Sequence, residues 1–416
     1  MARVLLLSNT TGYQANAFKA AAERIGVEIV LASDRCHVLE DPWGDGAIPV
    51  RFQEPQQSAE KIADFARRYS IDAVVAIGDA PTMTAAFAAE RLGLSFHPPH
   101  AVDACRNKWI ARERFKATGL RMPWYKRFPA DEDPAIASAE VPFPCVLKPL
   151  GLSASRGVIR ANDKHEFNAA FKRIELLLAA ADVRSSKQDS TQWIQVESYI
   201  PGSEFALEGL VTEGRLKVLA LFDKPDPLEG PYFEETIYVT PSRLLSRDQH
   251  AIFGCAQSAI SALGLQHGPV HAEFRFNEKG AWVLEVAARP IGGLCAKSLR
   301  FETEMALEEL IIRHALGEDM SEIRRENAAS GVMMIPIPAA GVYEGVENVA
   351  QAEKVKGIES VEITAKLQQK LVPLPEGASY LGFIFARGTT PEFVEEALRE
   401  AHSKLQFQIS AELKVV

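Results

Sequence analysis

The sequence lacks any apolar run long enough to cross a membrane. The run VLLL at residues 4–7 is shorter than the apolar region of a secretory signal peptide, and no later segment approaches the length of a transmembrane helix. The sequence therefore predicts a cytoplasmic protein that does not use a membrane as a partner.

Cysteine is scarce, with five residues in a chain of 416 and no CxxC spacing between them. An odd number of scattered cysteines argues against a disulfide framework. We expect reduced thiols with a structural role.

Positive charge is also limited. The formal net charge is -9, and the chain has no long run of Lys or Arg. This balance argues against nucleic acid or an anionic membrane as the main partner. The expected partners are small molecules, and the chain could act as a homodimer.

Several motifs of phosphate binding and covalent catalysis are missing. The chain contains neither GxxxxGK[ST] nor GxGxxG. His-Ala-Glu at residues 271–273 matches the H-x-E pattern of zinc deaminases, but the downstream PCxxC is absent. We also find no persuasive Ser/His/Asp or Cys/His set for nucleophilic catalysis.

What the first hundred residues do contain is an alternation of strand-like and helical patterns. VLLL, VEIVLA and IDAVVAIGD read as strands, and helices are expected near residues 15–25 and through Arg91. This predicts a parallel α/β domain over residues 1–102. SNTTGYQAN after the first strand could hold a phosphate but is better interpreted as an ordinary turn, and HPPH at residues 97–100 as a rigid linker rather than a metal site.

The expected pattern of helices and strands changes twice in the rest of the chain. A single helix with Lys108 in its first half is expected over residues 103–118, then strands around a loop, a helix over 163–180 and a mobile linker, VRSSKQDSTQ. Strands dominate residues 191–325, with helices near 247–263 and 302–316. Residues 326–416, with the strand YLGFIFARG and the helix PEFVEEALREAHSKL, predict a small α+β domain.

Small residues form most of the loop GLSASRG, residues 151–157, which we call the small-residue loop. Its backbone N–H groups and the hydroxyls of Ser153 and Ser155 could close over a phosphate chain, while Lys148 at the end of the preceding strand neutralises it. Taken alone, such a loop is more often a flexible hairpin.

Two glutamates stand out in the strand pair HAEFRFNEKGAWVLEVAARPIGG, residues 271–293. A three-residue loop with Gly280 left-handed would set Glu273 opposite Glu285, whereas a two-residue loop would separate them by face. Opposed like charges destabilise a strand pair, so this register favours a bound cation, and oxygen ligands suit magnesium or manganese better than zinc. Two solvated glutamates on a hairpin edge are the alternative.

The central region contains, in chain order, Lys108, Lys148, the small-residue loop, Glu197, Glu204, the Glu273 and Glu285 pair, and Arg289 followed by Gly292 and Gly293. This ordered set resembles the ATP-grasp superfamily, in which two α+β subdomains clamp ATP between antiparallel sheets and activate a carboxylate as an acyl phosphate. The resemblance covers residues 1 to about 320. Within the superfamily the chain is similar to the L-amino-acid ligases (dipeptide synthases), whose extra C-terminal domain resembles the segment with SYLGFIFARG. The implied fold combines α/β and α+β domains: a parallel α/β domain (1–102), an ATP-grasp clamp with antiparallel sheets (103–190 and 191–325) and a small α+β domain (326–416).

The resemblance implies an ATP-dependent, ADP-forming ligase that joins an amino acid carboxylate to an amine, expected to be that of a second amino acid. The residues implied for ATP are Lys108, Lys148, Ser153, Ser155 and Gly157 at the phosphates, Glu197 with residues 198–200 at the adenine, and Glu204 at the ribose. Those implied for magnesium, or manganese, are Glu273 and Glu285. Those implied for the substrates are Glu235, Tyr238, His271, Gly292 and Gly293, with Arg289 as the catalytic residue.

Two positions depart from the family pattern. Ala287 stands where many ATP-grasp proteins have Asn, so we expect the metal shell to use two carboxylates, phosphate oxygens and water. Tyr238 stands where dipeptide ligases have the His of a Glu-x-x-His motif that reads the amino acid substrate.

Two other functions suit the same residues. A carboxylase of the biotin-carboxylase type would require bicarbonate and a biotin-bearing partner. A regulatory or carrier protein would close over ATP without turnover, although both metal glutamates and Arg289 count against it.

Overall fold

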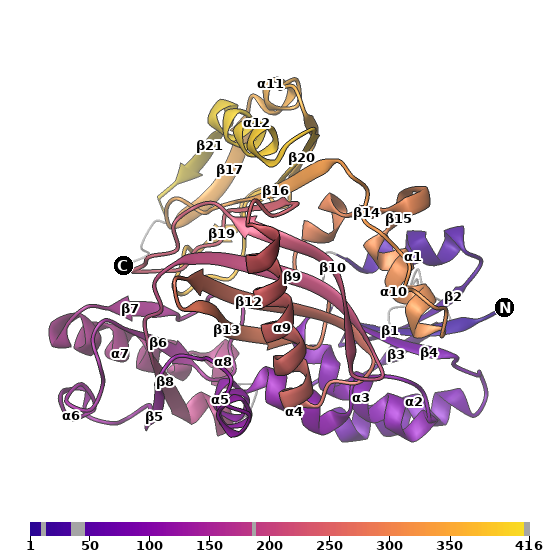
Figure 1. Cartoon of the computed structure of the whole chain (residues 1–416), viewed down its shortest axis with the longest axis horizontal. Coiled ribbons are helices and arrows are strands. Elements are labelled where there is room, and N and C mark those ends of the chain that lie inside the picture. Colours follow the sequence, from indigo (N-terminus) through magenta and orange to yellow (C-terminus); the bar gives the residue numbers. More distant parts are fainter. Residues whose placement is uncertain (10–13, 35–45, 185–188, 412–416) are drawn as a thin grey trace.

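The computed structural model describes residues 1–9, 14–34, 46–184 and 189–411 (Figure 1). It has the mixed α/β architecture expected from the sequence, with a parallel sheet followed by antiparallel sheets. Within these ranges, no helix combines the length and apolarity needed to cross a membrane. Cys36 lies outside the described residues, and the other four cysteines are free thiols.

The N-terminal third forms a four-stranded parallel sheet in the order β3-β2-β1-β4, with helices packed against it. Its elements are β1 (Arg3–Ser8), α1 (Ala15–Arg24), β2 (Glu28–Ser33), β3 (Ala47–Pro49), α2 (Pro55–Ala66), β4 (Ala73–Ile77) and α3 (Asp79–Leu92). Every residue of β4 is buried, as expected for a strand covered on both faces. The turn SNTTGYQAN falls partly on residues 10–13, which lie outside the described residues.

The helix expected over residues 103–118 is wrong in one respect. It is broken at Asn107, which separates α4 (Pro99–Arg106) from α5 (Lys108–Ala117). Asn107 has extended backbone angles, and its side-chain oxygen accepts hydrogen bonds from Trp109 N and Ile110 N, so it caps the second helix. Lys108 is therefore the first residue of α5 and not a mid-helix residue.

A four-stranded antiparallel sheet in the order β5-β8-β6-β7 follows. Its strands are β5 (Tyr125–Pro129), β6 (Cys145–Pro149), β7 (Ile159–Ala161) and β8 (Trp193–Ser198), with helices α6 (Pro134–Ala137), α7 (Lys164–Ala179), α8 (Ala181–Arg184) and the 3-10 helix η2 (Asp189–Gln192). Apolar side chains of α7, including Phe167 and Phe171, form a core with this sheet. Residues 185–188 of the expected linker lie outside the described residues, and α8 and η2 form its two ends.

The largest element is an eight-stranded sheet in the order β13-β12-β9-β10-β11-β16-β20-β18. Its strands are β9 (Ser203–Thr212), β10 (Arg215–Lys224), β11 (Ile237–Thr240), β12 (Gly268–Asn277), β13 (Gly280–Ala287), β16 (Ala329–Ile335), β18 (Ile358–Ile363) and β20 (Gly382–Gly388). The long helix α9 (Ser246–Leu263) lies across one face of it (Figure 1). The sheet continues across residue 325, and the division into domains at residues 102, 190 and 325 stays a prediction.

The remaining elements connect this sheet to its neighbours. They are η3 (Cys295–Ser298), β14 (Arg300–Phe301), η4 (Glu302–Glu304), β15 (Met305–Ala306), α10 (Leu307–Ala315), β17 (Gly341–Glu347), α11 (Val349–Ala352), β19 (Lys370–Leu371), α12 (Pro391–Lys404) and β21 (Gln406–Ser410). The helix expected near residues 302–316 starts later, at α10. β19, β17 and β21 form a small antiparallel sheet. One apolar core joins Val4 and Leu6 of β1 to Phe222 of β10 and Leu310 of α10, so the parallel sheet and the large sheet pack on each other.

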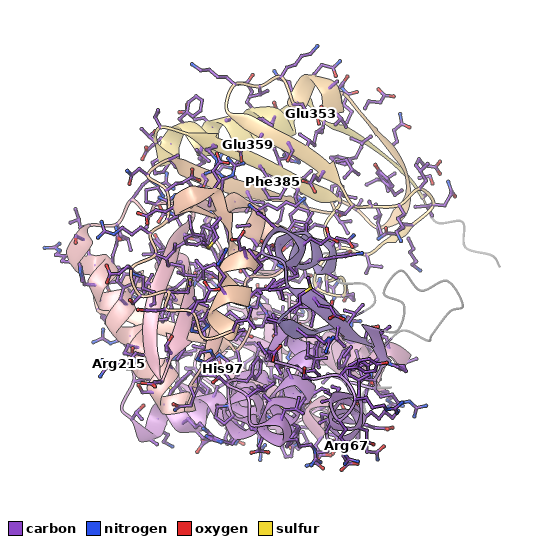
Figure 2. The ribbon with its side chains drawn as sticks, turned by 90° about the vertical axis from the view of Figure 1, so that its right-hand side faces the viewer. Arg67, His97, Arg215, Glu353, Glu359 and Phe385 are labelled. Atoms are coloured by element: carbon purple, nitrogen blue, oxygen red, sulfur yellow. The ribbon has the colours of Figure 1, made fainter. Side chains whose placement is uncertain are left out.

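His97, the first residue of HPPH, lies inside the molecule (Figure 2). Its Nε2 donates to Pro269 O of β12 at 3.2 Å, and its Nδ1 accepts from Gln266 N at 3.2 Å. Both ring nitrogens are thus used by the neutral imidazole. Burial, together with the nearby rings of His267 and His314, lowers the pKa of His97 to about 3. The histidine ties the end of the parallel domain to β12, so HPPH is a packed junction.

Protonation of His97 should destabilise the fold in acid. An unfolded histidine has a pKa of about 6.5, so the stabilisation is complete above that pH and falls by about 1.4 kcal/mol per pH unit as the pH drops toward the folded pKa. His97→Gln should reduce the pH slope of the unfolding free energy by close to one proton between pH 6 and pH 4.5, measured by urea denaturation. An unchanged slope would contradict this assignment.

Candidate functional site

A cavity of about 320 Å³ lies between the four-stranded and the eight-stranded antiparallel sheets. It is also lined by Asp79 at the start of α3 and by Tyr380 and Phe383 near β20. Every site residue predicted from the sequence lines it, except Gly157. The predicted residues therefore converge, although they span almost 200 positions of the chain.

Glu273 of β12 and Glu285 of β13 are direct cross-strand partners. The expected pairing is right, but the expected loop is wrong. Asn277 pairs with Gly280, so the turn has two residues, and the register shifts between Glu273 and Phe274, where Leu284 is the extra residue on β13. This β-bulge re-aims Glu285 toward the face of Glu273.

Lys224, the last residue of β10, lies among three carboxylates. Its Nζ is 2.9 Å from Glu204 Oε1 and 3.5 Å from Glu273 Oε2, and it also donates to Glu235. The Lys224 side chain is only 2% exposed, so its charge is buried with these carboxylates. The three carboxylates hold the pKa of Lys224 well above its usual value despite burial, so it remains an ammonium.

For Glu273, by contrast, the surroundings favour the neutral form of the side chain. Burial is the largest influence and, with the neighbouring Glu235, Glu204 and Glu285, raises the pKa of Glu273 to about 8 despite the nearby ammonium of Lys224. One carboxylate oxygen from each of Glu204, Glu235 and Glu273 lies within 4.8 Å of the others. The site thus concentrates more negative charge than Lys224 alone compensates, and its oxygen donors suit a hard divalent cation such as magnesium.

Glu197 of β8 is buried in an ion-pair network. Its Oε1 accepts from Arg112 Nε of α5 at 2.8 Å and from Gln195 Nε2 at 2.7 Å, and its Oε2 accepts from Lys148 Nζ at 2.7 Å. Burial alone would raise its pKa, but the charges of Arg112 and Lys148 lower the pKa of Glu197 to about 2. The carboxylate therefore orients Lys148 at the cavity.

Glu204 of β9 has a similar arrangement on the other side. Its Oε1 accepts from Lys224 and its Oε2 from Arg275 Nε at 3.1 Å. Arg275 is buried and also donates to Ile200 O at 2.8 Å and Tyr199 OH at 2.9 Å. Arg275 thereby fixes the segment expected to meet the adenine.

The small-residue loop covers one end of the cavity. Ala154 and Ser155 have φ values of 55° and 54°, a left-handed conformation that side chains rarely adopt. Lys108 Nζ donates to Leu152 O at 2.7 Å and lies 3.9 Å from Glu285 Oε2, so it bridges this loop and the β12–β13 hairpin. Gly157 lies away from the cavity, and its N–H donates to Pro375 O.

Arg289 is held by Asp79, a residue that the sequence analysis missed. Arg289 Nε is 3.0 Å from Asp79 Oδ1, and Nη2 is 3.2 Å from Oδ2. This bidentate pair overcomes the effect of burial, lowering the pKa of Asp79 and raising that of Arg289. Asp79 follows Gly78 at the carboxyl end of β4, the edge of a parallel sheet where ligand sites form, and that position was the available signal.

Glu208 of β9 is a second residue that the sequence analysis missed. It contacts both His271 and the segment that contains Gly292 and Gly293. His271 Nδ1 is 3.0 Å from Glu208 Oε2, and its Nε2 is 3.8 Å from Glu273 Oε1. Burial lowers the pKa of His271, so the ring is neutral at physiological pH. Glu208 also accepts from Ile291 N, directly before Gly292, and so aligns the histidine with that segment.

Glu235 and Tyr238, the first and last residues of the Glu-x-x-Tyr segment, are hydrogen-bonded to each other. Tyr238 OH donates to Glu235 Oε2 at 2.8 Å, and the Tyr238 ring packs beneath Lys224. Gly293 has φ +60°, and a Cβ there would lie 3.0 Å from the Phe383 ring. The rings of Tyr238 and Phe383 therefore line the cavity close to the Glu235 carboxylate.

Three family models match the chain in sequence order. An ATP-grasp N-terminal domain matches residues 18–96, an ATP-grasp domain matches residues 141–298, and an L-amino acid ligase C-terminal domain 2 matches residues 333–410. The chain belongs to the ATP-grasp superfamily, and the ligases among its homologues and structural neighbours are enzymes that form carbon–nitrogen bonds.

The chain is also similar to individual proteins. The chain is 22% identical to the uncharacterised protein y4rH of Sinorhizobium fredii over 99% of its own length and 84% of that protein. It is 28% identical to an alanine–anticapsin ligase of Bacillus subtilis over 57% of its own length and about half (52%) of that protein. Its fold is similar to an L-amino acid ligase from Bacillus licheniformis, with a TM-score of 0.80 at 24% identity over 99% of both chains.

The Glu197 network should stabilise the fold as well as orient Lys148. Removing one partner of a buried charge pair leaves the others uncompensated, at a cost of about 3 kcal/mol. Glu197→Gln should lower the unfolding free energy by about that amount, measured by chemical denaturation. The matched control is Glu278→Gln in the exposed hairpin turn, expected to change stability by less than about 0.5 kcal/mol. Equal effects of the two changes would refute the network's role.

Proposed function

We propose that this protein is an ATP-dependent, ADP-forming ligase that activates an amino acid carboxylate as an acyl phosphate and joins it to the amine of a second amino acid. The observation that carries the proposal is the cross-strand pair Glu273 and Glu285 facing one cavity together with Arg289 and two lysines. Such a constellation suits a reaction in which one anion must approach another.

ATP would occupy the cleft between the two antiparallel sheets. Lys108 and Lys148 would neutralise its phosphates, and Ser153 and Ser155 of the small-residue loop would cover them. The carboxylate of Glu197 already accepts hydrogen bonds from Arg112 and Lys148. We therefore propose that the adenine contacts the backbone of residues 197–200 instead. Glu204, which can accept further hydrogen bonds, would take the ribose hydroxyls.

Glu273 and Glu285 would hold Mg²⁺, or Mn²⁺, against the phosphates. A divalent cation there supplies charge neutralisation for phosphoryl transfer. The donor set fits this ion because both side chains offer only oxygen, and the raised pKa of Glu273 reflects uncompensated negative charge at that position. His271, held by Glu208, would orient Glu273 and line the substrate site.

The acid substrate would lie beside Arg289. The guanidinium, fixed by Asp79, would bind the carboxylate and then the oxyanion that forms when the amine attacks. Gly292 and Gly293 would let backbone N–H groups approach the same oxygen, and a Cβ at Gly292 would meet nothing within 4 Å. Glu235, oriented by Tyr238, would accept the ammonium group of the amino acid.

The match to an L-amino acid ligase C-terminal domain favours this reaction over a carboxylase of the biotin-carboxylase type. ADP release would be measured over pairs of amino acids and over bicarbonate, with the product identified by mass. Release that depends on an amine supports the ligase, whereas a bicarbonate requirement supports the carboxylase and ATP binding without turnover supports a regulator. A cytoplasmic location and a homodimer are further proposals.

Glu285→Gln tests the metal assignment. The change keeps the shape of the side chain but removes the negative charge of one of the two proposed metal ligands. Amine-dependent ADP release should therefore fall by at least about 100-fold while the fold is retained. The control Glu278→Gln, in the same hairpin, should keep wild-type turnover. Unchanged turnover in Glu285→Gln would refute the assignment.

Asp79→Asn tests the positioning of Arg289. Loss of the bidentate pair should let the guanidinium move, and misplacement by about 1 Å can cost about 100-fold in rate. We expect kcat to fall by roughly that factor with a small change in the KM for ATP, whereas the exposed Asp64→Asn should match the wild type. A rise in the KM for ATP at constant kcat would instead assign Asp79 to nucleotide binding.

A further inference from the structure

The segment of residues 373–380, which we call the C-terminal strap, connects the two sheets of the C-terminal region. It begins after β19 of the small sheet and ends before β20 of the eight-stranded sheet. Its first turn is tight, because Gly377 N donates to Pro373 O and a Cβ at Gly377 would lie 1.8 Å from Val372 O. The first half of the strap is therefore a compact turn between its connections to β19 and β20.

The strap contacts the small-residue loop directly. Gly157 N donates to Pro375 O at 2.8 Å, and Arg156 Nε donates to Glu376 O at 2.8 Å. A Cβ at Gly157 would lie 2.7 Å from Pro149 and 2.9 Å from Leu177, so the backbone of the loop is confined at this point. The end of the loop is thus held between β6, α7 and the strap.

The side chain of Glu376 adds a third connection. Arg173 of α7 donates from Nε to Glu376 Oε1 at 2.5 Å and from Nη2 to Oε2 at 2.9 Å. The remaining guanidinium nitrogen of Arg173 donates to Tyr232 OH at 2.5 Å. This planar two-point contact fixes the direction of the strap relative to the subdomain that carries Lys148.

The other end of the same strap lines the functional cavity. Ala378, Ser379 and Tyr380 border it, next to Phe383 of β20 and opposite Glu235 and Tyr238. Only Gly377 therefore separates the contact at Glu376 from Ala378, the first residue of the cavity wall. If the small-residue loop moves and Glu376 moves with it, residues 378–380 at the cavity wall must move as well.

We propose that Glu376 is a positioning residue for the ligation, which couples closure of the small-residue loop over the nucleotide to completion of the substrate cavity. The inference rests on the proposed function, in that the loop covers the phosphates of ATP. When the loop is closed, Arg173 and Glu376 hold residues 378–380 in place at the substrate end. When it opens, the wall of that cavity opens with it.

The test is amide hydrogen exchange of the strap in the full-length protein, with and without magnesium and the non-hydrolysable analogue AMP-PNP. In the wild type, nucleotide should slow exchange in peptides that cover residues 373–380 by at least about fivefold, the lower range of measured couplings between sites. In Glu376→Ala, which removes the contact with Arg173, AMP-PNP should still bind while this slowing falls below about twofold.

A charge-reversed pair supplies the rescue. Arg173→Glu combined with Glu376→Arg should restore the nucleotide-dependent slowing, which a purely structural loss would not. The matched control is Glu54→Ala, which breaks an exposed pair with Arg51 in another part of the chain and should leave the strap response unchanged. In turnover, Glu376→Ala should raise the KM for both substrates by about fivefold, with a smaller change in kcat.

The outcomes separate this inference from the function on which it rests. AMP-PNP binding without any change of strap exchange in the wild type would overturn the coupling and leave the ligase proposal standing. If nucleotide slows hydrogen exchange in the strap but no amine-dependent ADP release is found, the ligase proposal would be overturned and the coupling retained. Failure of the reversed pair to restore the response would overturn the role of Glu376.

Discussion

The site depends on the compensation of buried negative charge. Glu204, Glu235 and Glu273 lie close together in a largely buried environment, where an uncompensated carboxylate is costly. Lys224 and Arg275 supply two fixed positive charges, and both are themselves buried. The Glu285 side chain beside them is 38% exposed, and in the proposed function a divalent cation at Glu273 and Glu285 would balance the remaining negative charge. The arrangement of these charged side chains therefore follows from one electrostatic constraint.

The same constraint explains how distant chain segments meet. Glu197 links α5 to β6 through Arg112 and Lys148, and Asp79 links the parallel sheet to the segment after β13 through Arg289. Each pair has partners far apart in sequence, so its formation depends on the completed fold. Domain packing and the geometry of the reacting groups are thus determined together.

Patterns with a local cause were predicted well from the sequence. Alternating polarity predicted the strand pair that carries Glu273 and Glu285, and the helices α7 and α12 begin at the capping residues Asp163 and Thr390. The loop length was wrong because a bulge at Leu284 depends on packing that the turn residues do not encode. Asp79, Arg112 and Glu208 were missed because a single charged residue has no motif, and the side chain that it pairs with lies more than 60 residues away.

The eight-stranded sheet also affects how the chain can be divided. β16, β20 and β18 extend the sheet that begins with β13 and β12, and β16 pairs along the whole of β11. A chain that ended near residue 325 would leave β11 as an open edge with unpaired backbone groups, a surface prone to aggregation. The C-terminal region is therefore an integral part of the scaffold, and gain, loss or exchange of that region during evolution would require a new covering for this strand.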